Sequence, residues 1–535
     1  MKLKVLKPIR IGISVIFLLL YTLIFIDILN IIPENYFKYI SFFQVIPSIE
    51  KFIFAPTLIA SGFLFILLIS AFWGRVYCST FCPVGTLQDF IIFLKRKVSR
   101  KRIKYSFRAH HNLLRYSILA IVIITLFFGS VFALNISDPY SIFGKIIYYL
   151  VRPAAIFINN SVSEIFSNDD KQIPLIEYGD FFIYLFSFSV IIIFTLIIMS
   201  WRNGRLYCNT ICPLGALLGL ISKYSIFQLE LSGSSCTACG LCERACKANC
   251  IDNKKMELDF SRCISCFDCI KVCNLDSMKY KNSYSNRKLN SLDRSLTINN
   301  KKREKPNFSV DIKKRKIITT APIIAAALTG LNSCKDEVKL NTSSYKQGQR
   351  TAPVSPPGSA SIHHFTELCT SCQLCIAACP TKVLQASFIE YGISGIFQPR
   401  MDFYNGFCNY ECKKCSEVCP TGAILPLKLE DKKLKQIGIS HFIKEECIIY
   451  EYEKDCGACS EHCPTKAVQM VDFKDNLKIP KIDEEICIGC GACEYACPVV
   501  PVTPIYVLSN LEHKSAKKPK QEKVKQVNTE DDFPF

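Results

Sequence analysis

The sequence lacks the short motifs that bind the commonest redox and nucleotide cofactors. It has no C-x-x-C-H motif for c-type haem, no G-x-G-x-x-G after a predicted strand, no P-loop and no evident pair of nucleophile and base. We therefore predict no haem c, flavin or NAD site and no stand-alone catalytic site.

Histidine is also scarce, with seven residues in the whole chain. Two adjacent pairs, His110-His111 and His363-His364, could bind a metal or accept protons from quinol. Histidines beside a membrane or in a linker are usually solvated, however, and this is the simpler interpretation.

Hydrophobic and basic residues, by contrast, are abundant. Half of the 535 residues are hydrophobic, the mean hydropathy is +0.21 and the formal net charge is +19. Four apolar runs, each near the ~20 residues that span a bilayer, lie at residues 11–26, 54–72, 116–134 and 181–200. We predict four transmembrane helices within residues 1–230. A cleaved signal peptide is the alternative for the first run, but no small-residue cleavage site follows it.

The distribution of charge predicts the orientation of these helices. Basic residues precede the first run, follow the second at residues 95–104 and follow the fourth, whereas the loop at 136–180 has six acids and three bases. The positive-inside rule then places both ends of the four-helix unit in the cytoplasm. Residues 140–159, in the outer loop, could lie along the membrane surface or pack as an ordinary loop.

A twelve-residue repeat follows the second and fourth runs. Residues 74–85 read GRVYCSTFCPVG and residues 204–215 read GRLYCNTICPLG, with eight identical positions. Cysteines four residues apart would share one face of a short helix. The repeat predicts a bound soft metal, a disulfide or a redox thiol pair at Cys78, Cys82, Cys208 and Cys212.

Twenty-four of the 30 cysteines fall into six groups of four, and Cys250 and Cys334 belong to no group. The first two groups have the C-x2-C-x2-C-x3-C spacing of a two-cluster bacterial ferredoxin, in which the fourth cysteine of each group binds the other cluster. This predicts one cluster on Cys236, Cys239, Cys242 and Cys273, and another on Cys263, Cys266, Cys269 and Cys246. Structural zinc, which usually uses two separated C-x2-C knuckles, is the weaker alternative.

Two features make Cys246 the least secure of these eight ligands. Lys247 and Asn274 stand where proline normally follows the fourth cysteine, and Cys250 is close enough to compete with Cys246.

The second array has four groups, and each ends in Cys-Pro. Its cysteines are Cys369, Cys372, Cys375, Cys379, Cys408, Cys412, Cys415, Cys419, Cys447, Cys456, Cys459, Cys463, Cys487, Cys490, Cys493 and Cys497. The second group opens with an x3 spacing and the third with x8. Four [4Fe-4S] clusters in two ferredoxin-like pairs are expected, which brings the total to six. Two pairings remain open: first with second and third with fourth, or first with fourth around second with third.

A short apolar segment at residues 317–334 separates the two arrays. It follows the basic residues 313–316, but only ~22 Å of helix fits between residues 317 and 331, so it resembles an export signal more than a robust anchor. Residues 314–318 nearly match a twin-arginine signal, and residues 331–334 form a loose lipobox. We favour export of the second array, either on an uncleaved short helix or as a lipoprotein attached through Cys334, over a wholly cytoplasmic protein.

The predicted fold is an α-helical membrane domain of four transmembrane helices plus a short fifth apolar segment, with α+β bacterial-ferredoxin-like 4Fe-4S domains. The predicted segments are a membrane domain at 1–230, a two-cluster ferredoxin domain at 231–280, a basic linker at 281–316, the apolar segment at 317–334, a flexible tether at 335–361, a four-cluster domain at 362–510 and a disordered tail at 511–535.

These motifs carry a family resemblance. Four helices with two C-x3-C-P motifs and a two-cluster ferredoxin resemble NapH/MauN proteins, and the four-cluster part resembles NapG/MauM proteins, so the chain looks like a fusion of the two. The membrane half is also similar to those of NosR and CcoG proteins. NosR-like regulators carry an outer flavin-binding domain with no counterpart before Ile11, and CcoG-like proteins end in a cysteine-free β-domain.

The resemblance implies a membrane-bound component of a quinol dehydrogenase. It implies electron transfer from quinol through the clusters to a periplasmic reductase of the nitrate or nitrous oxide type, or to a cytochrome c. The expected site is the bacterial inner membrane, with the first ferredoxin domain in the cytoplasm, the second array in the periplasm and no nucleic-acid partner. The alternatives are a CcoG-like copper reductase and a maturation factor for a periplasmic metalloenzyme.

Overall fold

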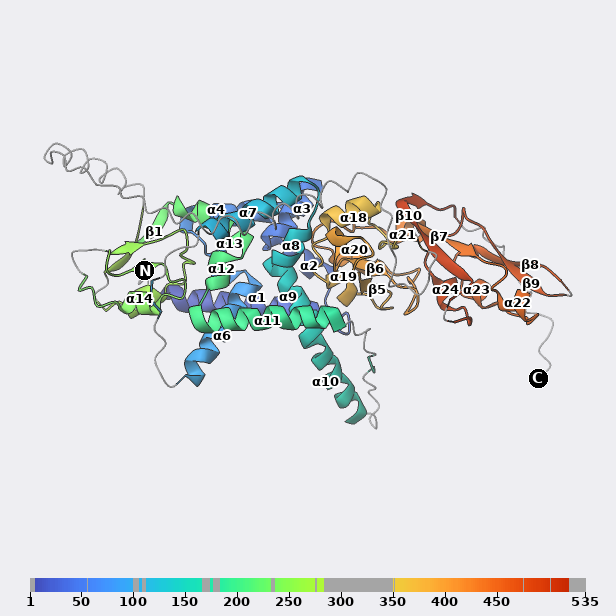
Figure 1. Ribbon diagram of the computed structural model, residues 1–535, viewed down its shortest axis with the longest axis horizontal. Coiled ribbons are helices and arrows are strands. Elements are labelled where there is room, and N and C mark those ends of the chain that lie inside the picture. Colours follow the sequence, from blue (N-terminus) through green and yellow to red (C-terminus); the bar gives the residue numbers. More distant parts are fainter. Residues whose placement is uncertain are drawn as a thin grey trace, which may run out of the picture.

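The structure, a computed structural model, describes residues 5–54, 56–99, 105–107, 112–165, 174–176, 183–231, 236–274, 277–282, 350, 352–474, 476–500 and 502–518. Figure 1 shows a helical unit in the middle, with short helices and small sheets at each of its two ends. The predicted apolar segment at 317–334, Cys334 and most of the predicted linker lie outside the described residues.

The helical unit combines long apolar helices with short ones. Its first part comprises α1 (Leu6–Ile26), α2 (Glu34–Phe42), α3 (Val45–Phe54), η2 (Leu58–Ser61), α4 (Gly62–Trp73), α5 (Tyr77–Thr80) and α6 (Pro83–Val98). Its second part comprises α7 (Asn112–Phe127), α8 (Phe132–Ser137), α9 (Pro139–Ile146), η3 (Ile147–Val151), α10 (Arg152–Ile165), α11 (Ile183–Asn203), α12 (Leu206–Thr210) and α13 (Pro213–Lys223). Proline begins α6, α9 and α13, where its missing N–H costs no hydrogen bond.

Three helices are long and apolar enough to cross a membrane, namely α1, the continuous run Pro139–Ile165 and α11. The expected runs at 11–26 and 181–200 correspond to α1 and α11. The run at 54–72, however, is interrupted at η2 and leaves the 12-residue α4, and the run at 116–134 gives the 16-residue α7. The count of four transmembrane helices is therefore not confirmed.

Of the two alternatives for residues 140–159, packing within the protein holds for the first part of the run, although as a helix and not as a loop. Tyr140, Phe143 and Lys145 are at most 2% exposed, and α9 packs against both α6 and α11. The run continues into α10 through a π-helical turn at η3, which accommodates Pro153 because proline cannot donate the usual backbone hydrogen bond.

The first small domain follows α13 directly. Strand β1 (Phe227–Leu231) pairs antiparallel with β4 (Met278–Asn282), and β2 (Ile251–Asp252) pairs with β3 (Glu257–Leu258). The short helices α14 (Leu241–Ala245) and α15 (Asp268–Val272) pack against each other. The predicted boundaries of 231–280 were slightly too narrow, because both outer strands extend beyond them.

The second array forms two such domains in sequence. The first contains α18 (Ile362–Leu368), α19 (Leu374–Ala377), β5 (Leu384–Ala386), η6 (Ile393–Gly395), β6 (Pro399–Met401) and α20 (Lys414–Val418). The second contains α21 (Leu429–Lys433), β7 (Lys435–Phe442), α22 (Ile448–Glu451), α23 (Ala458–Glu461), β8 (Val468–Asp472), β9 (Lys478–Ile482), α24 (Ala492–Tyr495) and β10 (Ile505–Ser515). The strands pair antiparallel as β5 with β6, β7 with β10 and β8 with β9.

Two predicted boundaries of this array are wrong. Residues 352–361 are packed rather than a flexible tether, because the carbonyl oxygens of Val354 and Gly358 accept backbone hydrogen bonds from Met401 and Leu425. Residues 511–515 belong to β10 rather than to a disordered tail, and the side chain of His513 lies 2.9 Å from the Ser355 hydroxyl. Residues 519–535 lie outside the described residues.

Helix α1 connects the two ends of the molecule. At its start, Lys7 pairs with Asp268 of the first small domain. At its end, Phe25 lies beside Gly144 and the backbone of Cys372, and α1 contacts α19 of the second array. Twenty-one residues of helix rise ~31 Å, about the thickness of a membrane's hydrocarbon core. The two cysteine arrays therefore lie at opposite ends of a helix of membrane-spanning length.

Candidate functional site

The cysteines of the first array gather as the spacing predicts for one of its two clusters. Cys246, Cys263, Cys266 and Cys269 line one pocket, and Cys250 lines it as well. The sulfur atoms of Cys246 and Cys250 lie 3.5 Å apart, so the predicted closeness of these two thiols is confirmed, whereas their competition for a cluster stays a prediction.

The other predicted set of this array lies around α14 and α15. Cys236 and Cys239 precede α14, Cys242 lies within it, and Cys273 follows α15. Burial raises the pKa of Cys242, and the nearby Cys236 and Cys239 raise it further. The placement of Cys273 as the fourth ligand of this set stays a prediction.

In the second array, the third and fourth groups exchange their last cysteines. Cys447, Cys456 and Cys459 line one pocket with Cys497, whereas Cys487, Cys490 and Cys493 line another with Cys463. This is the crossed arrangement of a two-cluster ferredoxin.

The first and second groups form the other pair. Burial raises the pKa of Cys375, and the neighbouring thiols of Cys369, Cys372 and Cys419 raise it further. Burial likewise raises the pKa of Cys415, together with Cys408, Cys379 and Cys412. Of the two pairings left open by the sequence, the structure thus has first with second and third with fourth.

The two pairs of the second array meet at a specific contact. The backbone N–H of Cys408 donates a 2.9 Å hydrogen bond to the carbonyl oxygen of Cys490. Cys372 faces the helical unit, and the set around Cys447 and Cys456 lies in the distal part of the array, with α22 and α23 (Figure 1). The four sets therefore follow one another outward from the helical unit.

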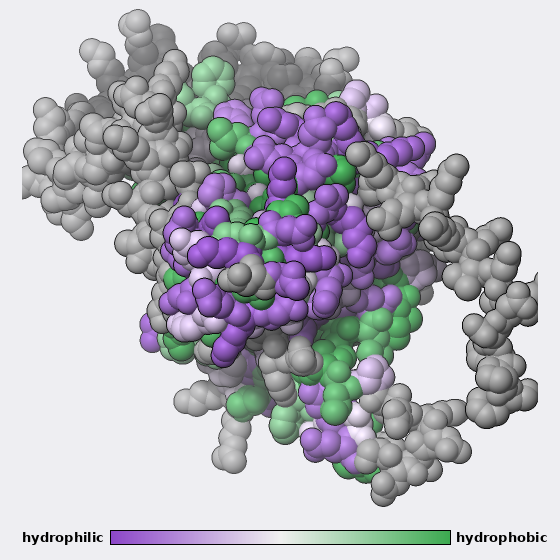
Figure 2. All heavy atoms as spheres, turned by 90° about the vertical axis from the view of Figure 1, so that its right-hand side faces the viewer, coloured by the Kyte–Doolittle hydropathy of each residue, from purple (hydrophilic) through white to green (hydrophobic). Residues whose placement is uncertain are grey.

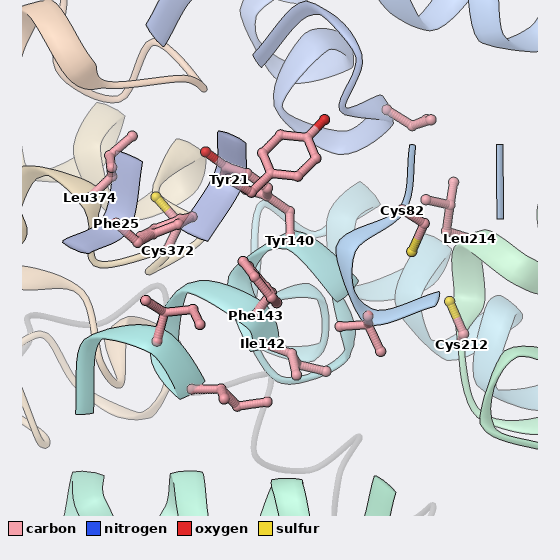
Figure 3. Packing of buried hydrophobic residues seen from close by; sticks show 14 of the residues in the cluster. Tyr21, Phe25, Cys82, Tyr140, Ile142, Phe143, Cys212, Leu214, Cys372 and Leu374 are labelled. Carbon is pink, nitrogen blue, oxygen red and sulfur yellow. The ribbon is translucent and has the colours of Figure 1, made fainter. Parts of the chain in front are cut away.

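Cys78, Cys82, Cys208 and Cys212, here called the quartet, are buried in the helical unit at 4–6% exposure. Burial raises the pKa of the Cys82 thiol, and the nearby Cys78, Cys208 and Cys212 raise it further. The two halves of the repeat, 130 residues apart in sequence, thus bring their four thiols to one place. Figure 3 shows the sulfur atoms of Cys82 and Cys212 side by side.

The prediction that each cysteine pair lies on one face of a short helix is wrong. Cys78 lies in α5, but Cys82 is the N-cap of α6, with extended backbone angles, and its sulfur accepts the N–H of Gly85 at 3.4 Å. Cys208 and Cys212 repeat this arrangement at α12 and α13. The reason is the proline after each second cysteine, which disfavours helical angles at the residue before it.

The last glycine of each repeat is explained by a close approach of the backbone. A side-chain carbon at Gly85 would lie 2.3 Å from the carbonyl oxygen of Cys78, and one at Gly215 would lie 2.2 Å from that of Cys208. Only glycine lets the two helices of each repeat pack this tightly.

The arginine of each repeat crosses to the opposite half. Arg75 donates to the carbonyl oxygen of Cys208 at 3.0 Å, and Arg205 donates to that of Cys78 at 2.7 Å. Each guanidinium also lies 3.9 Å from the sulfur of its own half, at Cys78 and Cys208 respectively. Our sequence interpretation missed these arginines, although their identical place in both repeats was a signal for them.

Asp89 ties the quartet to the first array and to α1. Its carboxylate pairs with Arg10 at 3.1 Å, Arg205 at 2.9 Å and Lys247 at 3.0 Å. Burial alone would raise the pKa of Asp89, but Arg205 and Lys247 hold it well below the usual range. Lys247, which replaces the usual proline after Cys246, also pairs with Asp268 at 3.3 Å. This departure from the ferredoxin pattern is therefore a contact with the helical unit.

Aromatic side chains lie between the quartet and the second array. Tyr21 and Tyr140 have ring centroids 6.1 Å apart, and Phe25 lies 5.5 Å from Tyr140. In Figure 3 these rings lie between Cys82 on one side and Cys372 on the other. A hydrogen-bonded group of Tyr21, Gln44 and Tyr77 adjoins them, with Gln44 bonded to both tyrosine hydroxyls.

The histidine pairs contribute no metal site among the described residues. His363 pairs with Glu367 at 3.2 Å, His364 contacts the carbonyl oxygen of Gly422, and His110-His111 lies outside the described residues. Within the described ranges, no three His, Cys, Asp or Glu side chains are close enough to hold a single metal ion.

Comparison with known proteins identifies iron-sulfur domains in three parts of the chain. A family described as a 4Fe-4S binding domain matches residues 55–101 and 185–230, which contain the two halves of the quartet. Two families described as 4Fe-4S dicluster domains match residues 368–424 and 454–500, in agreement with the pairing found above. The chain is an iron-sulfur electron-transfer protein.

Curated relatives of this iron-sulfur protein support the same conclusion. The ferredoxin-type protein NapF of Escherichia coli K12 is 29% identical over 29% of this chain and 85% of its own length. The methylamine utilization ferredoxin-type protein MauM of Methylophilus methylotrophus is 32% identical over 26% of this chain and 65% of its own. The regulatory protein NosR of Pseudomonas aeruginosa is 24% identical over 37% of this chain and 23% of its own. No solved structure matches the chain significantly.

Proposed function

We propose that this protein is the membrane-bound electron-transfer component of a quinol dehydrogenase. In this proposal it passes electrons from quinol through six [4Fe-4S] clusters to a periplasmic reductase of the nitrate or nitrous oxide type, or to a cytochrome c. One quinol releases two electrons and two protons, and [4Fe-4S] clusters are one-electron carriers that would pass the two electrons singly.

The observation that carries the proposal is the order of the cysteine sets along the molecule. The two sets of the first array lie at the start of α1, the quartet lies within the helical unit, and the four sets of the second array continue outward from the end of α1. A storage or structural role would not require the sets to follow one another across a membrane-spanning length.

The surface of the helical unit supports a place in the bacterial inner membrane. Large apolar side chains such as Ile16, Leu19 and Leu23 on α1, and Ile191 and Phe194 on α11, are more than half exposed. Figure 2 shows that the face formed by the second array is mostly hydrophilic, with hydrophobic surface beneath it.

The charge distribution supports the proposed orientation. The first array packs where the basic Lys7 and Arg10 begin α1, on the side that the positive-inside rule places in the cytoplasm. The second array packs against α9 and α10 of the predicted outer loop, where Arg152 donates to the carbonyl oxygen of Ala377 at 2.7 Å. We therefore infer that the second array faces the periplasm.

Isolated membranes test the proposal. Addition of quinol under anaerobic conditions is expected to reduce the clusters, so that the signals of reduced [4Fe-4S] clusters appear in electron paramagnetic resonance. An oxidised reductase partner is expected to reoxidise the clusters and remove these signals. If quinol leaves the clusters oxidised, while dithionite reduces them, the quinol dehydrogenase role is wrong.

A further inference from the structure

The four cysteines of the quartet are not among the predicted ligands of the six clusters. Each half of the repeat contributes one cysteine from a short helix and one from the N-cap of the next helix, in the same arrangement. The two crossing arginines make the halves interdependent, because each guanidinium bonds the backbone of the opposite half.

A buried arginine beside the quartet has no negatively charged partner among the described residues. Arg75 is fully buried, and among the described residues its partners are the Asn209 side chain, the carbonyl oxygens of Cys208 and Ser261 and the sulfur of Cys78, with no carboxylate. Its Nε has no hydrogen-bond partner. An isolated buried charge is costly unless it is paired. Four neutral thiols would leave Arg75 unpaired, whereas four thiolates around a metal-sulfur core would pair it.

The adjoining ion pairs do not supply this anion. Asp89 and Asp268 together serve four cations, Lys7, Arg10, Arg205 and Lys247, so this network is itself positive by two charges. The excess lies between the quartet and the pocket lined by Cys246 and Cys263. Anionic centres in both places would balance it.

A single zinc ion would need the four sulfur atoms closer together than a [4Fe-4S] cluster does. Zinc–sulfur bonds of about 2.3 Å in a tetrahedron would bring the sulfur atoms to about 3.8 Å of one another. No three ligating side chains among the described residues are placed to hold one ion. A cubane is a larger body that holds its ligands further apart.

We propose that Cys78, Cys82, Cys208 and Cys212 together bind one [4Fe-4S] cluster, shared by the two halves of the repeat, which links the two cysteine arrays. The matched family describes each half as 4Fe-4S binding, and the new element is one shared centre with a defined place in the path. That place rests on the proposed electron-transfer function, whereas the existence of the centre does not.

The quartet has direct contacts on the side of the first array. The side chain of Asn209 donates to the carbonyl oxygen of Ala248 at 3.1 Å, and the backbone N–H of Arg205 donates to that of Lys247 at 2.8 Å. Lys247 and Ala248 are the two residues that follow Cys246 in the sequence. Arg75 also donates to the carbonyl oxygen of Ser261, two residues before Cys263.

On the other side, the aromatic side chains of Tyr21, Tyr140 and Phe25 lie between Cys82 and Cys372 (Figure 3). The redox step is a one-electron transfer from a reduced centre in one array to the quartet centre, and then to an oxidised centre in the other array. It makes and breaks no bond and moves no proton.

Metal analysis of the full-length protein, purified anaerobically in detergent, tests the shared centre. We expect about 28 iron atoms per chain, at four per cluster, rather than the about 24 of six clusters. Cys82→Ser and Cys212→Ser, one from each half, should each lose about four iron atoms and four sulfides and should abolish the same paramagnetic signal. Ser79→Ala, in the same short helix as Cys78, is the matched control and should lose none.

Several results would overturn the proposal. A wild-type content near 24 iron atoms, unchanged in both cysteine variants, would exclude the centre, and loss in only one variant would show that the halves do not share it. If either variant fails to fold, the wild-type content still decides. If both variants lose four iron atoms but quinol still reduces both arrays, the place of the centre in the path is wrong. Failure of quinol to reduce the wild type would refute the quinol dehydrogenase role but not the centre.

Discussion

Replacement of Asp89 by asparagine tests how the helical unit and the first array are held together. The carboxylate of Asp89 is shared by three cations that are at most 7% exposed, Arg10 of α1, Arg205 beside the quartet and Lys247 beside Cys246. Asparagine keeps the size of the side chain but removes its charge, so three buried cations lose their common partner.

The expected destabilisation follows from the cost of removing one partner of a buried ion pair, which leaves the opposite charge buried without a partner. This cost is about 3–5 kcal/mol. At about 2–4 °C per kcal/mol for a domain of this size, the melting temperature should fall by about 6–20 °C. Because the pKa of Asp89 is lowered in the folded protein, its stabilisation is complete above the unfolded value of about 3.9 and is lost only as the pH falls further. The difference between wild type and variant should therefore be the same at pH 6 and pH 8.

Thermal unfolding in detergent, followed through the visible absorbance of the clusters, measures this difference. Lys281→Ala is the matched control, because it breaks a half-exposed pair with Glu230 at 3.7 Å, which is worth about 0–1 kcal/mol. A decrease for Asp89→Asn no larger than that of the control would refute the reasoning about the shared carboxylate.

Three further predictions concern single side chains. The hydroxyl of Thr421 lies 3.7 Å from the sulfur of Cys419. Thr421→Val should therefore lower the reduction potential of the cluster bound by Cys419 by about 20–60 mV, the equivalent of a hydrogen bond of about 0.5–1.5 kcal/mol. An unchanged redox titration would contradict this. Cys246→Ser should retain its cluster through Cys250, whereas the double variant with Cys250→Ser should lose about four iron atoms. If the single variant already loses these iron atoms, Cys250 cannot replace Cys246 as a ligand. Gly215→Ala should lower the melting temperature of the quartet region, because its new methyl group would lie 2.2 Å from a carbonyl oxygen, and an unaltered melt would contradict the close packing.

The cysteine sets could be predicted from sequence because ligand spacing is a local property. The crossed pairing of Cys463 and Cys497 follows the ferredoxin rule, but which group pairs with which depends on the fold, and only the structure resolved it. The ion pair of Lys247 could not be predicted either, because its partner Asp89 lies 158 residues away along the chain and only the fold brings the two together.

The helices were predicted less well than the cysteines. Hydropathy recognised α1 and α11, but it could not distinguish a helix exposed to lipid from one buried by protein. Residues 140–159 carry charges such as Lys145 and Arg152, which left a position on the membrane surface open, yet the fold buries Lys145 and bonds it to the carbonyl oxygen of Asn135 at 2.7 Å. A twelve-residue apolar helix such as α4 cannot be separated by composition from one half of a longer span.

The central claim is that electrons cross the helical unit between the two arrays. Sealed spheroplasts, reduced with a membrane-permeant reductant and then treated with an oxidant that cannot cross the membrane, test this most directly. The account predicts that both arrays are reoxidised in the wild type, whereas in Cys212→Ser only the second array is reoxidised. A first array that stays reduced in the wild type would contradict the account.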